Sequence, residues 1–434
     1  MEKRWVIKKQ GDPERVATLS GELNINKHLA NLLVQRGITN YQQAKEFFRP
    51  ELSKLHDPFL MKDMDRAIER IEKAIRNKEK ILVYGDYDVD GTTAVSLVYT
   101  YLKKFHDQLD FYIPDRYSEG YGISYQSIDF ACEKGFSLVI ALDCGIKAVE
   151  KIAYAGEKGL DFIICDHHRP GDTLPDAVAV LDPQREDCHY PFEELSGCGV
   201  GFKLIQAYQQ KECLPFEELE QYLDLVVVSI AADIVPVTGE NRILAYYGLK
   251  LINSNPRPGI EAILYYSNIK RKDQGLSKKN AFSKELNITD LVFLVGPRIN
   301  AAGRIESANN SVELLVADNF EKAQKFAEQI NNFNTERRNL DAQITQEALE
   351  MIDQDEEMKS QKATVVFNPE WHKGVIGIVA SRLTEVYYRP TVVLTKSNGL
   401  ITGSARSVKD FDVYDAIDSC SELLEHFGGH KYAA

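Results

Sequence analysis

Three aspartates stand at alternate positions in one short stretch of the chain, in the order Asp86, Asp88 and Asp90. The apolar and aromatic residues at 81–84 precede them and predict a buried strand, and a pattern of glycine and threonine after them opens a helix. Packing gives no reason to crowd three like charges, because they repel one another unless a cation lies among them. Oxygen ligands of this kind suit Mg²⁺ and Mn²⁺. A solvated acidic turn is the alternative, and the rest of the chain has to distinguish the two.

Strands and helices alternate regularly in the part of the chain that holds these aspartates. Alternation at this spacing predicts an α/β domain with a parallel, doubly wound sheet. In such sheets, ligands bind beyond the carboxyl ends of the strands. The apolar periodicity predicts strands at 81–84, 109–113, 138–142, 161–165 and 177–181, and helices at 64–78, 92–105, 124–134 and 147–158.

Two more groups of candidate ligands follow predicted strands. Asp143 comes after the third strand, and Asp166, His167 and His168 come after the fourth. Because the carboxyl ends of parallel strands share one edge of a sheet, the topology gathers these side chains in one place. A solvated turn explains one such cluster better than it explains three. The sequence therefore predicts a metal site, and mixed aspartate and histidine ligands favour Mn²⁺ over Mg²⁺.

Asp233 is a further candidate, because it follows an almost wholly apolar run at 225–232 that must be buried. A carboxylate at the end of such a run needs a partner. A helix cap or an internal salt bridge would satisfy it. A metal ion would also satisfy it, and this reading fits better with the other candidate ligands.

Composition limits the class of protein. The 434 residues carry a net charge of −13, which taken alone counts against a nucleic-acid partner, although bound metal ions would cancel charge at an acidic site. Seven cysteines without a CxxC pair argue against a disulfide framework or a structural zinc site and favour a reducing cytoplasm. The longest apolar run is too short for a membrane span, and no apolar signal core follows the basic N-terminus.

The chain also divides into segments of different character, and the first of them, residues 1–60, is a predicted helical lead-in. We interpret this lead-in as a packing appendage, with a DNA-binding helical hairpin as the alternative. The predicted segments are a helical lead-in at 1–60, an α/β domain at 61–265, a connecting region at 266–318, a linking helix of about 60 Å at 319–358, and a smaller α/β domain at 359–434. The smaller domain has predicted strands at 363–367, 390–395 and 399–407 and a predicted helix at 373–388.

Basic residues outside the first α/β domain are candidates for phosphate binding. Residues 268–285 are rich in lysine and predict an exposed loop. Residues 295–308 predict a second loop, whose small residues let the backbone approach a ligand and whose arginines suit phosphate. Near the end of the chain, His372, Arg406 and His430 each have a structural role as the alternative to a functional one.

The motifs GDYDVDG, LDCG, CDHH and AADIVP, in that order, resemble the DHH phosphoesterase superfamily. GPRINAAGR, WHKGVIGIVASRL, GSARS and GGHKYAA are similar to the flanking motifs of its RecJ branch, the single-strand-specific 5′→3′ DNA exonucleases. The resemblance runs from about residue 70 to the C-terminus. It implies a parallel-sheet DHH domain joined by a long helix to a smaller α/β DHHA1 domain, an active site in the cleft between them, and one or two Mn²⁺ or Mg²⁺ ions.

The resemblance also implies roles for individual residues. Asp143 is the expected bridge between two ions, His168 is expected to contact the scissile phosphate, and Asp166 is expected to support the histidines. The implied catalytic and metal-binding residues are Asp86, Asp88, Asp90, Asp143, His167, His168 and Asp233. The implied substrate-binding residues are His168, Arg298, Asn300, Arg304 and His430 in the cleft, and Arg116, Ser404 and Arg406 around a 5′-phosphate.

The implied reaction is two-metal hydrolysis of single-stranded DNA from a 5′ end to mononucleotides, in DNA repair and recombination. The expected protein is a cytoplasmic monomer, with single-strand-binding protein or a helicase as candidate partners. RecJ proteins continue beyond the motif GGHKYAA into an OB fold and a further domain, so we expect a truncated catalytic core with a weaker grip on DNA. Two alternatives stay open. One is a phosphodiesterase of short oligonucleotides or cyclic dinucleotides, and the other is a non-catalytic replication scaffold, against which the intact acidic set argues.

Overall fold

The structure is a computed structural model that describes residues 5–272, 281–425, 427–429 and 431–434. The chain divides into two compact units, the larger formed by Val6–Asn331 and the smaller mainly by Asn332–Ala434. The division falls inside one long helix, as expected for a helix that links two domains. Among the described residues, every helix is too short or too polar for a bilayer crossing.

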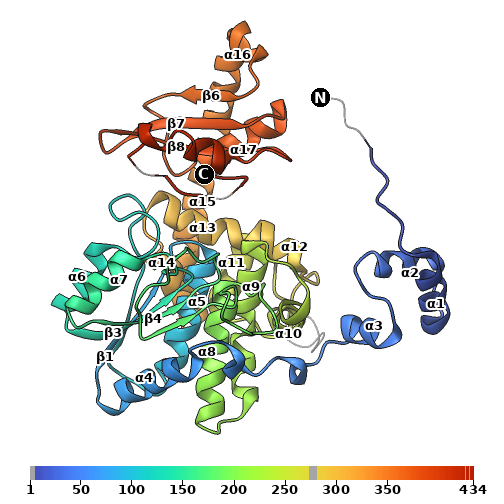
Figure 1. The fold of residues 1–434 in the computed structure, drawn as a ribbon, viewed down its shortest axis with the longest axis vertical. Coiled ribbons are helices and arrows are strands. Elements are labelled where there is room, and N and C mark those ends of the chain that lie inside the picture. Colours follow the sequence, from blue (N-terminus) through green and yellow to red (C-terminus); the bar gives the residue numbers. More distant parts are fainter. Residues whose placement is uncertain (1–4, 273–280, 426, 430) are drawn as a thin grey trace. The chain divides into compact units, whose positions relative to one another are not determined.

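A five-stranded parallel sheet forms the centre of the larger unit (Figure 1). Its strand order is β2-β1-β3-β4-β5, which confirms the predicted doubly wound α/β architecture. The chain leaves β1 on one side to form β2 and returns on the other side to form β3, so the topological switch point lies between β1 and β3. The strands are β1 (Lys80–Gly85), β2 (Leu109–Tyr112), β3 (Phe136–Leu142), β4 (Asp161–Cys165) and β5 (Ala179–Leu181).

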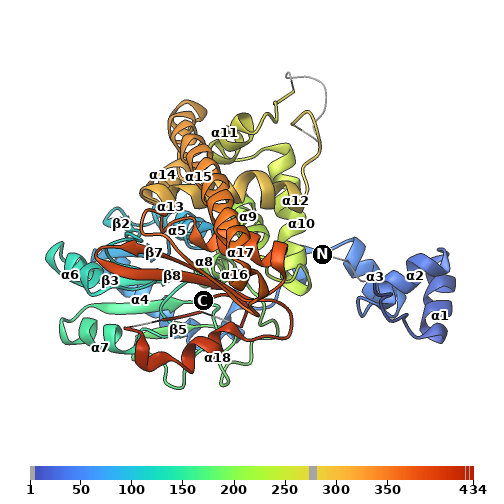
Figure 2. The ribbon, with the colours of Figure 1, turned by 90° about the horizontal axis from the view of Figure 1, so that it is seen from above.

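Helices cover both faces of this sheet. On one face, side chains such as Tyr84, Val139 and Ile164 pack against Ile128 and Ile152 of two helices that lie side by side in Figures 1 and 2. These helices are α6 (Tyr125–Glu133) and α7 (Val149–Glu157). The other face carries α4 (Met64–Arg76), α5 (Val89–Leu102) and α8 (Gly197–Lys211). Helix α5 begins three residues earlier than predicted, because the side chain of Asp88 caps its first turn.

Further helices pack around α5 and α8 in the larger unit. Helix α9 (Leu223–Asp233) is apolar along almost its whole length. Its residues from Leu223 to Ala231 are buried against neighbouring helices, as the sequence predicted. The remaining α-helices are α10 (Gly239–Ser254), α11 (Pro258–Tyr266), α12 (Ile288–Asp290), α13 (Gly296–Ile305) and α14 (Asn309–Leu315). There are also short 3₁₀ helices at Leu52–Lys54, Pro58–Leu60 and Phe216–Tyr222, and a π-helical turn at Leu291–Val295.

The loop predicted at 295–308 is wrong, because most of this segment forms helix α13. Pro297 stands in the first turn, where its missing N–H costs no hydrogen bond, and the alanines that follow favour a helix. Gly303 allows a close approach, since a Cβ there would lie 2.7 Å from the backbone oxygen of Tyr87. The glycines and alanines therefore serve helix packing near the acidic strand ends.

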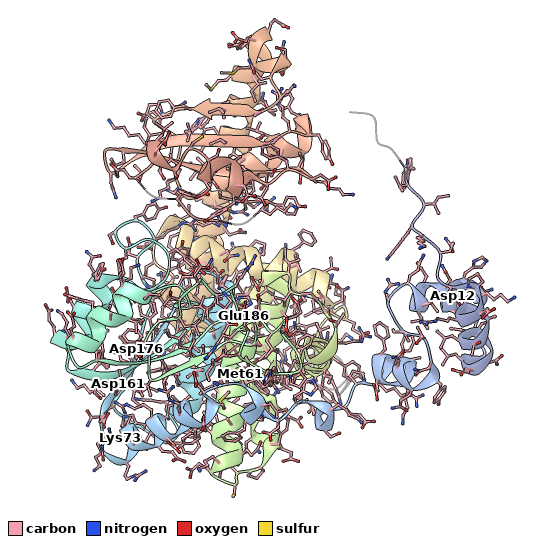
Figure 3. The ribbon with its side chains drawn as sticks, in the orientation of Figure 1. Asp12, Met61, Lys73, Asp161, Asp176 and Glu186 are labelled. Carbon is pink, nitrogen blue, oxygen red and sulfur yellow. The ribbon has the colours of Figure 1, made fainter. Side chains whose placement is uncertain are left out.

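Three short helices precede the sheet, in the part of the chain that was predicted to be a helical lead-in. They share a small core of their own that includes Leu19, Ala30 and Ala44. Asp12 caps the first of them by accepting a hydrogen bond of 2.9 Å from the Arg15 N–H (Figure 3). The helices are α1 (Pro13–Leu23), α2 (Lys27–Val34) and α3 (Tyr41–Phe48).

The smaller unit contains a three-stranded sheet in the order β6-β7-β8, with β6 and β7 parallel and β7 and β8 antiparallel. The linking helix ends at Gln354 rather than at the predicted residue 358, because Asp355 leaves the helix and caps the next one. Its length is therefore about 52 Å. The elements are α15 (Phe320–Gln354), α16 (Glu356–Ser360), β6 (Thr364–Phe367), α17 (Ile376–Tyr387), β7 (Thr391–Ser397), β8 (Leu400–Arg406), α18 (Val413–Asp418) and a 3₁₀ turn at Ser421–Leu423.

Candidate metal centre

Four neighbouring strands end at the same level of the large sheet. The last residue of β1 pairs with the last residue of β3, which pairs with the last residue of β4, which pairs with the last residue of β5. In every case the next residue along the chain is an aspartate. These aspartates are Asp86, Asp143, Asp166 and Asp182. The register thus aligns four carboxylates along one edge, at and beside the switch point where such sheets bind ligands.

Asp90 is held by the beginnings of two helices. It lies in the first turn of α5, and its carboxylate accepts hydrogen bonds from the N–H groups of Gly197 at 2.6 Å and Cys198 at 2.7 Å, where α8 begins. The hydroxyl of Ser229 on α9 donates a third hydrogen bond at 2.7 Å. Helix N-termini suit acidic side chains, so these contacts fix the position of the Asp90 side chain.

Asp143 lies against the same end of α8. Its backbone has a φ of 58° and donates a hydrogen bond of 2.9 Å to the carbonyl oxygen of Cys165, which ties the end of β3 to the end of β4. A Cβ on Gly197 would lie 2.6 Å from the Asp143 Cβ and 2.8 Å from its Oδ1. Gly197 therefore lets the start of α8 approach both Asp143 and Asp90.

Asp166 orients the two histidines that follow it. One of its carboxylate oxygens accepts hydrogen bonds from the N–H groups of His167 at 2.8 Å and His168 at 3.1 Å and lies 2.8 Å from His168 Nδ1, while the other accepts from the Ile146 N–H at 2.9 Å. These contacts match the predicted supporting role of Asp166. They leave Nε2 of His168 directed at other groups, among them the hydroxyl of Tyr121 at 3.4 Å.

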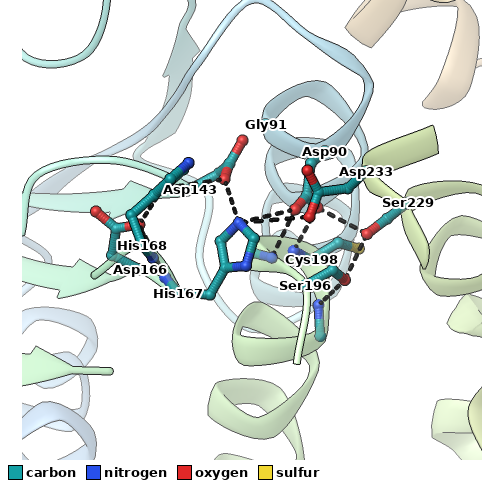
Figure 4. A network of polar contacts seen from close by, with 12 residues as sticks. Asp90, Gly91, Asp143, Asp166, His167, His168, Ser196, Cys198, Ser229 and Asp233 are labelled. Atoms are coloured by element: carbon teal, nitrogen blue, oxygen red, sulfur yellow. Dashed lines mark hydrogen bonds and ion pairs between the residues drawn. The ribbon is translucent and has the colours of Figure 1, made fainter. Parts of the chain in front are cut away.

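His167 stands in the middle of the acidic cluster, as Figure 4 shows. Its Nε2 lies 3.2 Å from an oxygen of Asp143, 3.5 Å from one of Asp90 and 3.6 Å from one of Asp233. Two sets of potential ligand atoms lie within 4.8 Å of one another. They are Asp143 with His167 and His168, and Asp90 with His167 and Asp233. The structure thus brings four of the six predicted metal ligands, Asp90, Asp143, His167 and Asp233, together with His168 in two overlapping groups.

Burial and like charges raise the pKa of several carboxyl groups at this edge. Burial raises the pKa of Asp143 well above its usual range, and the charges of Asp90 and Asp88 raise it further. Burial, followed by the charge of Asp88, has the same effect on the pKa of Asp86. For Asp233, burial and the charges of Asp90 and Asp88 raise the pKa to about 8. Carboxylates in this arrangement need a cation among them to be ionised together near neutral pH.

The donor atoms fit a divalent cation. Among the described residues, Asp86 Oδ1, Asp143 Oδ1 and His167 Nε2 are buried side-chain atoms without a hydrogen-bond partner. Buried polar atoms normally have hydrogen-bond partners, so three buried atoms without such partners at one site need an explanation. All three are good ligand atoms for Mn²⁺ or Mg²⁺. Asp86 and Asp88 belong to neither of the two groups of potential ligand atoms named above. One carboxylate oxygen of Asp88 accepts a hydrogen bond of 3.0 Å from the Gly91 N–H.

Comparison with known proteins decides the family. A profile described as "DHH family, N-terminal domain" matches residues 80–230, and one described as "DHHA1 domain" matches residues 360–434. The single-stranded-DNA-specific exonuclease RecJ of Dickeya dadantii is 34% identical over 424 residues, which cover 94% of this chain and 71% of the relative. The chain belongs to the RecJ family.

Two further RecJ proteins agree with this assignment. RecJ of Bacillus subtilis is 41% identical over 433 residues, which are 99% of this chain but 52% of that relative, so the chain spans about half of its length. The crystal structure of RecJ in complex with Mn²⁺ from Thermus thermophilus is 27% identical, with a TM-score of 0.81 over 98% of this chain and 58% of that one. The DHH and DHHA1 architecture expected from the motifs is confirmed.

Two residues beside the metal centre were missed by the sequence analysis of this RecJ-family chain. Asp182 follows β5 as the other aspartates follow their strands, and burial raises its pKa to about 7. The rule that found Asp143 would have found it too. Tyr121 packs edge-on against His168 and against Tyr87, whose ring carries the Arg116 guanidinium at 4.9 Å. Tyr121 belongs to the segment RYSEGYG at 116–122, which is similar to a RecJ motif.

The predicted substrate residues of the larger unit occupy different surroundings. Arg116 stacks on Tyr87 near the acidic cluster, and the Arg304 backbone oxygen accepts a hydrogen bond from the Tyr117 hydroxyl. Asn300 accepts a hydrogen bond of 3.1 Å from the Val89 N–H and so joins α13 to the start of α5. The Arg298 guanidinium donates to the Leu294 oxygen at 2.8 Å and to Asn331 at 3.2 Å. Their roles toward a substrate stay predictions.

The predicted residues of the smaller unit gather at the start of α17. Arg406 Nη1 lies 3.0 Å from the Ser404 hydroxyl, and a Cβ on Gly377 would lie 3.0 Å from that hydroxyl and 3.1 Å from Arg406 Nη2. His372 Nδ1 accepts a hydrogen bond of 3.2 Å from the Gly374 N–H in the turn before this helix. The prediction for His430 lies outside the described residues, and that for the loop at 268–285 lies partly outside them.

Proposed function

We propose that this chain is the catalytic core of a metal-dependent 5′→3′ exonuclease that hydrolyses single-stranded DNA to mononucleotides in DNA repair and recombination. The observation that carries the proposal is the row of strand-end aspartates with His167 in their centre and too many crowded carboxylates for a site without cations. The names of the relatives, single-stranded-DNA-specific exonucleases, support the substrate. The Thermus thermophilus structure, titled as a complex with Mn²⁺, supports the metal.

The proposed metal ligands are those that the motifs implied. When bound, two divalent ions at such a site supply an activated water and neutralise charge on the attacked phosphate. Asp143 is suited to serve both positions, because it lies between His168 and the group around Asp90. The residues that would hold the ions are Asp86, Asp88, Asp90, Asp143, His167 and Asp233.

The protein's own contribution is positioning. Asp90 is fixed by the hydrogen bonds from α8 and from Ser229, so its geometry needs no rearrangement when substrate binds. His168 is oriented by Asp166 at Nδ1, which leaves Nε2 for an oxygen of the scissile phosphate. Burial alone would lower the pKa of His168, but the hydrogen bond and charge of Asp166 outweigh it and raise the pKa to about 9. The ring can therefore donate to the phosphate at neutral pH.

The proposed contacts to a 5′-phosphate involve Ser404, Arg406 and Arg116. Ser404 and Arg406 stand on β8 and lie against Gly377 in the first turn of α17, where a larger side chain would crowd them. A hydroxyl, a guanidinium and a helix N-terminus together suit a phosphate. The proposal for Arg116 concerns the larger unit by itself, where its guanidinium stacks on the ring of Tyr87. Recognition of this end would give the reaction its 5′→3′ direction.

We further infer that the protein works as a monomer in the cytoplasm, with single-strand-binding protein or a helicase as partner. Seven free cysteines among the described residues, three of them buried, suit a reducing compartment. The DNA-processing role supports partners that present single strands.

The test is degradation of two end-labelled substrates in the presence of Mn²⁺, a single strand of about twenty nucleotides and a dinucleotide, with a duplex as control. We expect mononucleotides to be released from the 5′ end of the long strand while the duplex is spared. Hydrolysis of the dinucleotide alone would replace the proposal with a short-oligonucleotide phosphodiesterase. A metal-loaded protein that cleaves neither substrate would point to a scaffold.

A further inference from the structure

A groove runs between α2 and α3 in the helical lead-in, far along the sequence from the metal ligands. It has a volume of about 740 Å³, within the range of ligand-binding grooves. Its floor is mostly aliphatic, and large apolar side chains lie open along it. Leu29 is 54% exposed, Leu32 is 47% exposed and Phe48 is 58% exposed. Apolar side chains gathered in this way mark a binding surface more often than scattered ones do.

The rim of this α2–α3 groove carries charge of one sign. Among the described residues that line it, the charged ones are Arg36, Lys45 and Arg49. The whole chain has a net charge of −13, whereas the groove lining holds three positively charged residues and no acidic one among the described residues. The charge of the groove is therefore opposite in sign to the charge of the chain. Lys45 and Arg49 are exposed. An occupant with apolar side chains and negative charge would match both the floor and the rim.

The chemistry of the groove distinguishes between possible occupants. The exposed apolar stretch Trp5–Ile7 of the same chain is flanked by lysines and arginine, so the basic rim would repel it. Single-stranded nucleic acid is usually held by aromatic stacking platforms, and although Tyr41, Phe47 and Phe48 line the groove, aliphatic side chains outnumber them. Leucine-lined grooves accept the apolar face of an amphipathic peptide.

The groove is fixed to the DHH domain. The Arg242 guanidinium of α10 lies 3.5 Å from the ring centre of Phe47 and donates a hydrogen bond of 2.7 Å to its carbonyl oxygen. The Tyr247 hydroxyl, also on α10, donates to the carbonyl oxygen of Pro50 at 3.2 Å. A partner held in the groove is therefore tethered to the domain that carries the metal centre.

We propose that the α2–α3 groove is a docking site for an acidic amphipathic segment of a partner protein. The apolar side chains of the segment fill the groove over Leu29, Leu32 and Phe48. Its carboxylates pair with Lys45 and Arg49 at the rim. The site brings a partner to the enzyme without taking part in hydrolysis.

The experiment uses the full chain and two fluorescent peptides of about fifteen residues with leucine and phenylalanine at helical spacing. One peptide has aspartate and glutamate at all other positions, and the second has lysine there. Fluorescence anisotropy is measured for the wild type, for the Lys45→Glu/Arg49→Glu variant, for Phe48→Ala, and for Lys27→Glu. Lys27 is an exposed lysine at the start of α2 that does not line the groove, so it controls for the reversal of one positive charge outside the groove.

We expect the acidic peptide to bind the wild type and Lys27→Glu alike, and about tenfold or more weakly to the double variant, because two attractive pairs become repulsive. Phe48→Ala should weaken binding without changing its salt dependence. All four proteins should hydrolyse a short oligonucleotide at the same rate, which shows that they are folded. The proposal is overturned if the acidic peptide fails to bind the wild type, or if the lysine peptide binds with equal affinity. It is also overturned if a (dT)₁₂ oligonucleotide displaces the acidic peptide from the groove, or if the double variant changes only the self-association of the chain.

Discussion

The most direct test of the metal centre's geometry is Gly197→Ala. This glycine begins α8, donates its N–H to Asp90 at 2.6 Å, and allows Asp143 to approach closely. Its backbone is not left-handed, so alanine is compatible with its φ and ψ angles, and the added methyl group is the whole perturbation. That methyl would lie 2.6 Å from the Asp143 Cβ, so one of the two must move by several tenths of an ångström.

The cost of this movement has two parts. Overpacking of a tight contact costs about 1–3 kcal/mol, and alanine in a helix returns about 0.5–1 kcal/mol, so the free energy of unfolding should fall by up to about 2.5 kcal/mol. Because a displacement of about 1 Å at reacting groups costs about a hundredfold in rate, a movement of several tenths of an ångström should cost about tenfold or more. Gly156→Ala is the matched control, because it makes the same change in helix α7, where a Cβ would meet nothing within 4 Å. That variant should gain stability and keep full activity.

Both variants are measured by urea denaturation, by calorimetric titration with Mn²⁺, and by hydrolysis of a 5′-phosphorylated single strand. The reasoning requires Gly197→Ala to lose Mn²⁺ affinity and turnover together while it remains folded. Turnover and affinity within about twofold of the wild type, at any stability, would refute the claim that this contact positions Asp143.

Three further predictions concern charge. Asp143→Asn should leave the metal-free protein at least as stable, since it removes a buried charge, but should lower hydrolysis by about a thousandfold or more, and near-normal turnover would contradict the two-metal assignment. The raised pKa of Asp233, about 8, means that the folded metal-free chain holds this proton more tightly than the unfolded chain, so this contribution to stability is present below about pH 4 and is lost as the pH rises through 8. Because Mn²⁺ needs the ionised form, the rise in Tm on adding Mn²⁺ should be larger at pH 8.5 than at pH 6, and an equal rise would count against Asp233 as a ligand. Arg406→Ala should reduce the preference for 5′-phosphorylated over unphosphorylated strands more than it slows cleavage of saturating substrate, and equal losses on both strands would remove Arg406 from the pocket.

The sequence was sufficient for those features that depend on local periodicity and strand order. Alternating strands and helices predicted the parallel sheet, and the aspartates at predicted strand ends predicted the metal centre, because parallel strands bring their carboxyl ends to one edge. Asp182 lay within reach of the same rule. The prediction of a loop at 295–308 is wrong, because small residues are compatible with two structures. Glycine and alanine allow a close backbone approach in a loop, but alanine also favours a helix, and helix α13 forms here.

Other parts of the site come from long-range contacts that leave no local pattern. Ser229 and the N–H groups of Gly197 and Cys198 reach Asp90 across more than a hundred positions of sequence, and a backbone N–H has no residue signature. The contact of Tyr121 with His168 likewise spans 47 positions of sequence, and it depends on the turn that precedes α6. The sequence by itself therefore determined which residues could bind metal and at which edge of which sheet they would lie. Only the tertiary structure decided which backbone groups hold them in position, because those contacts arise from packing between α5, α8 and α9 rather than from the order of residues within any one of them.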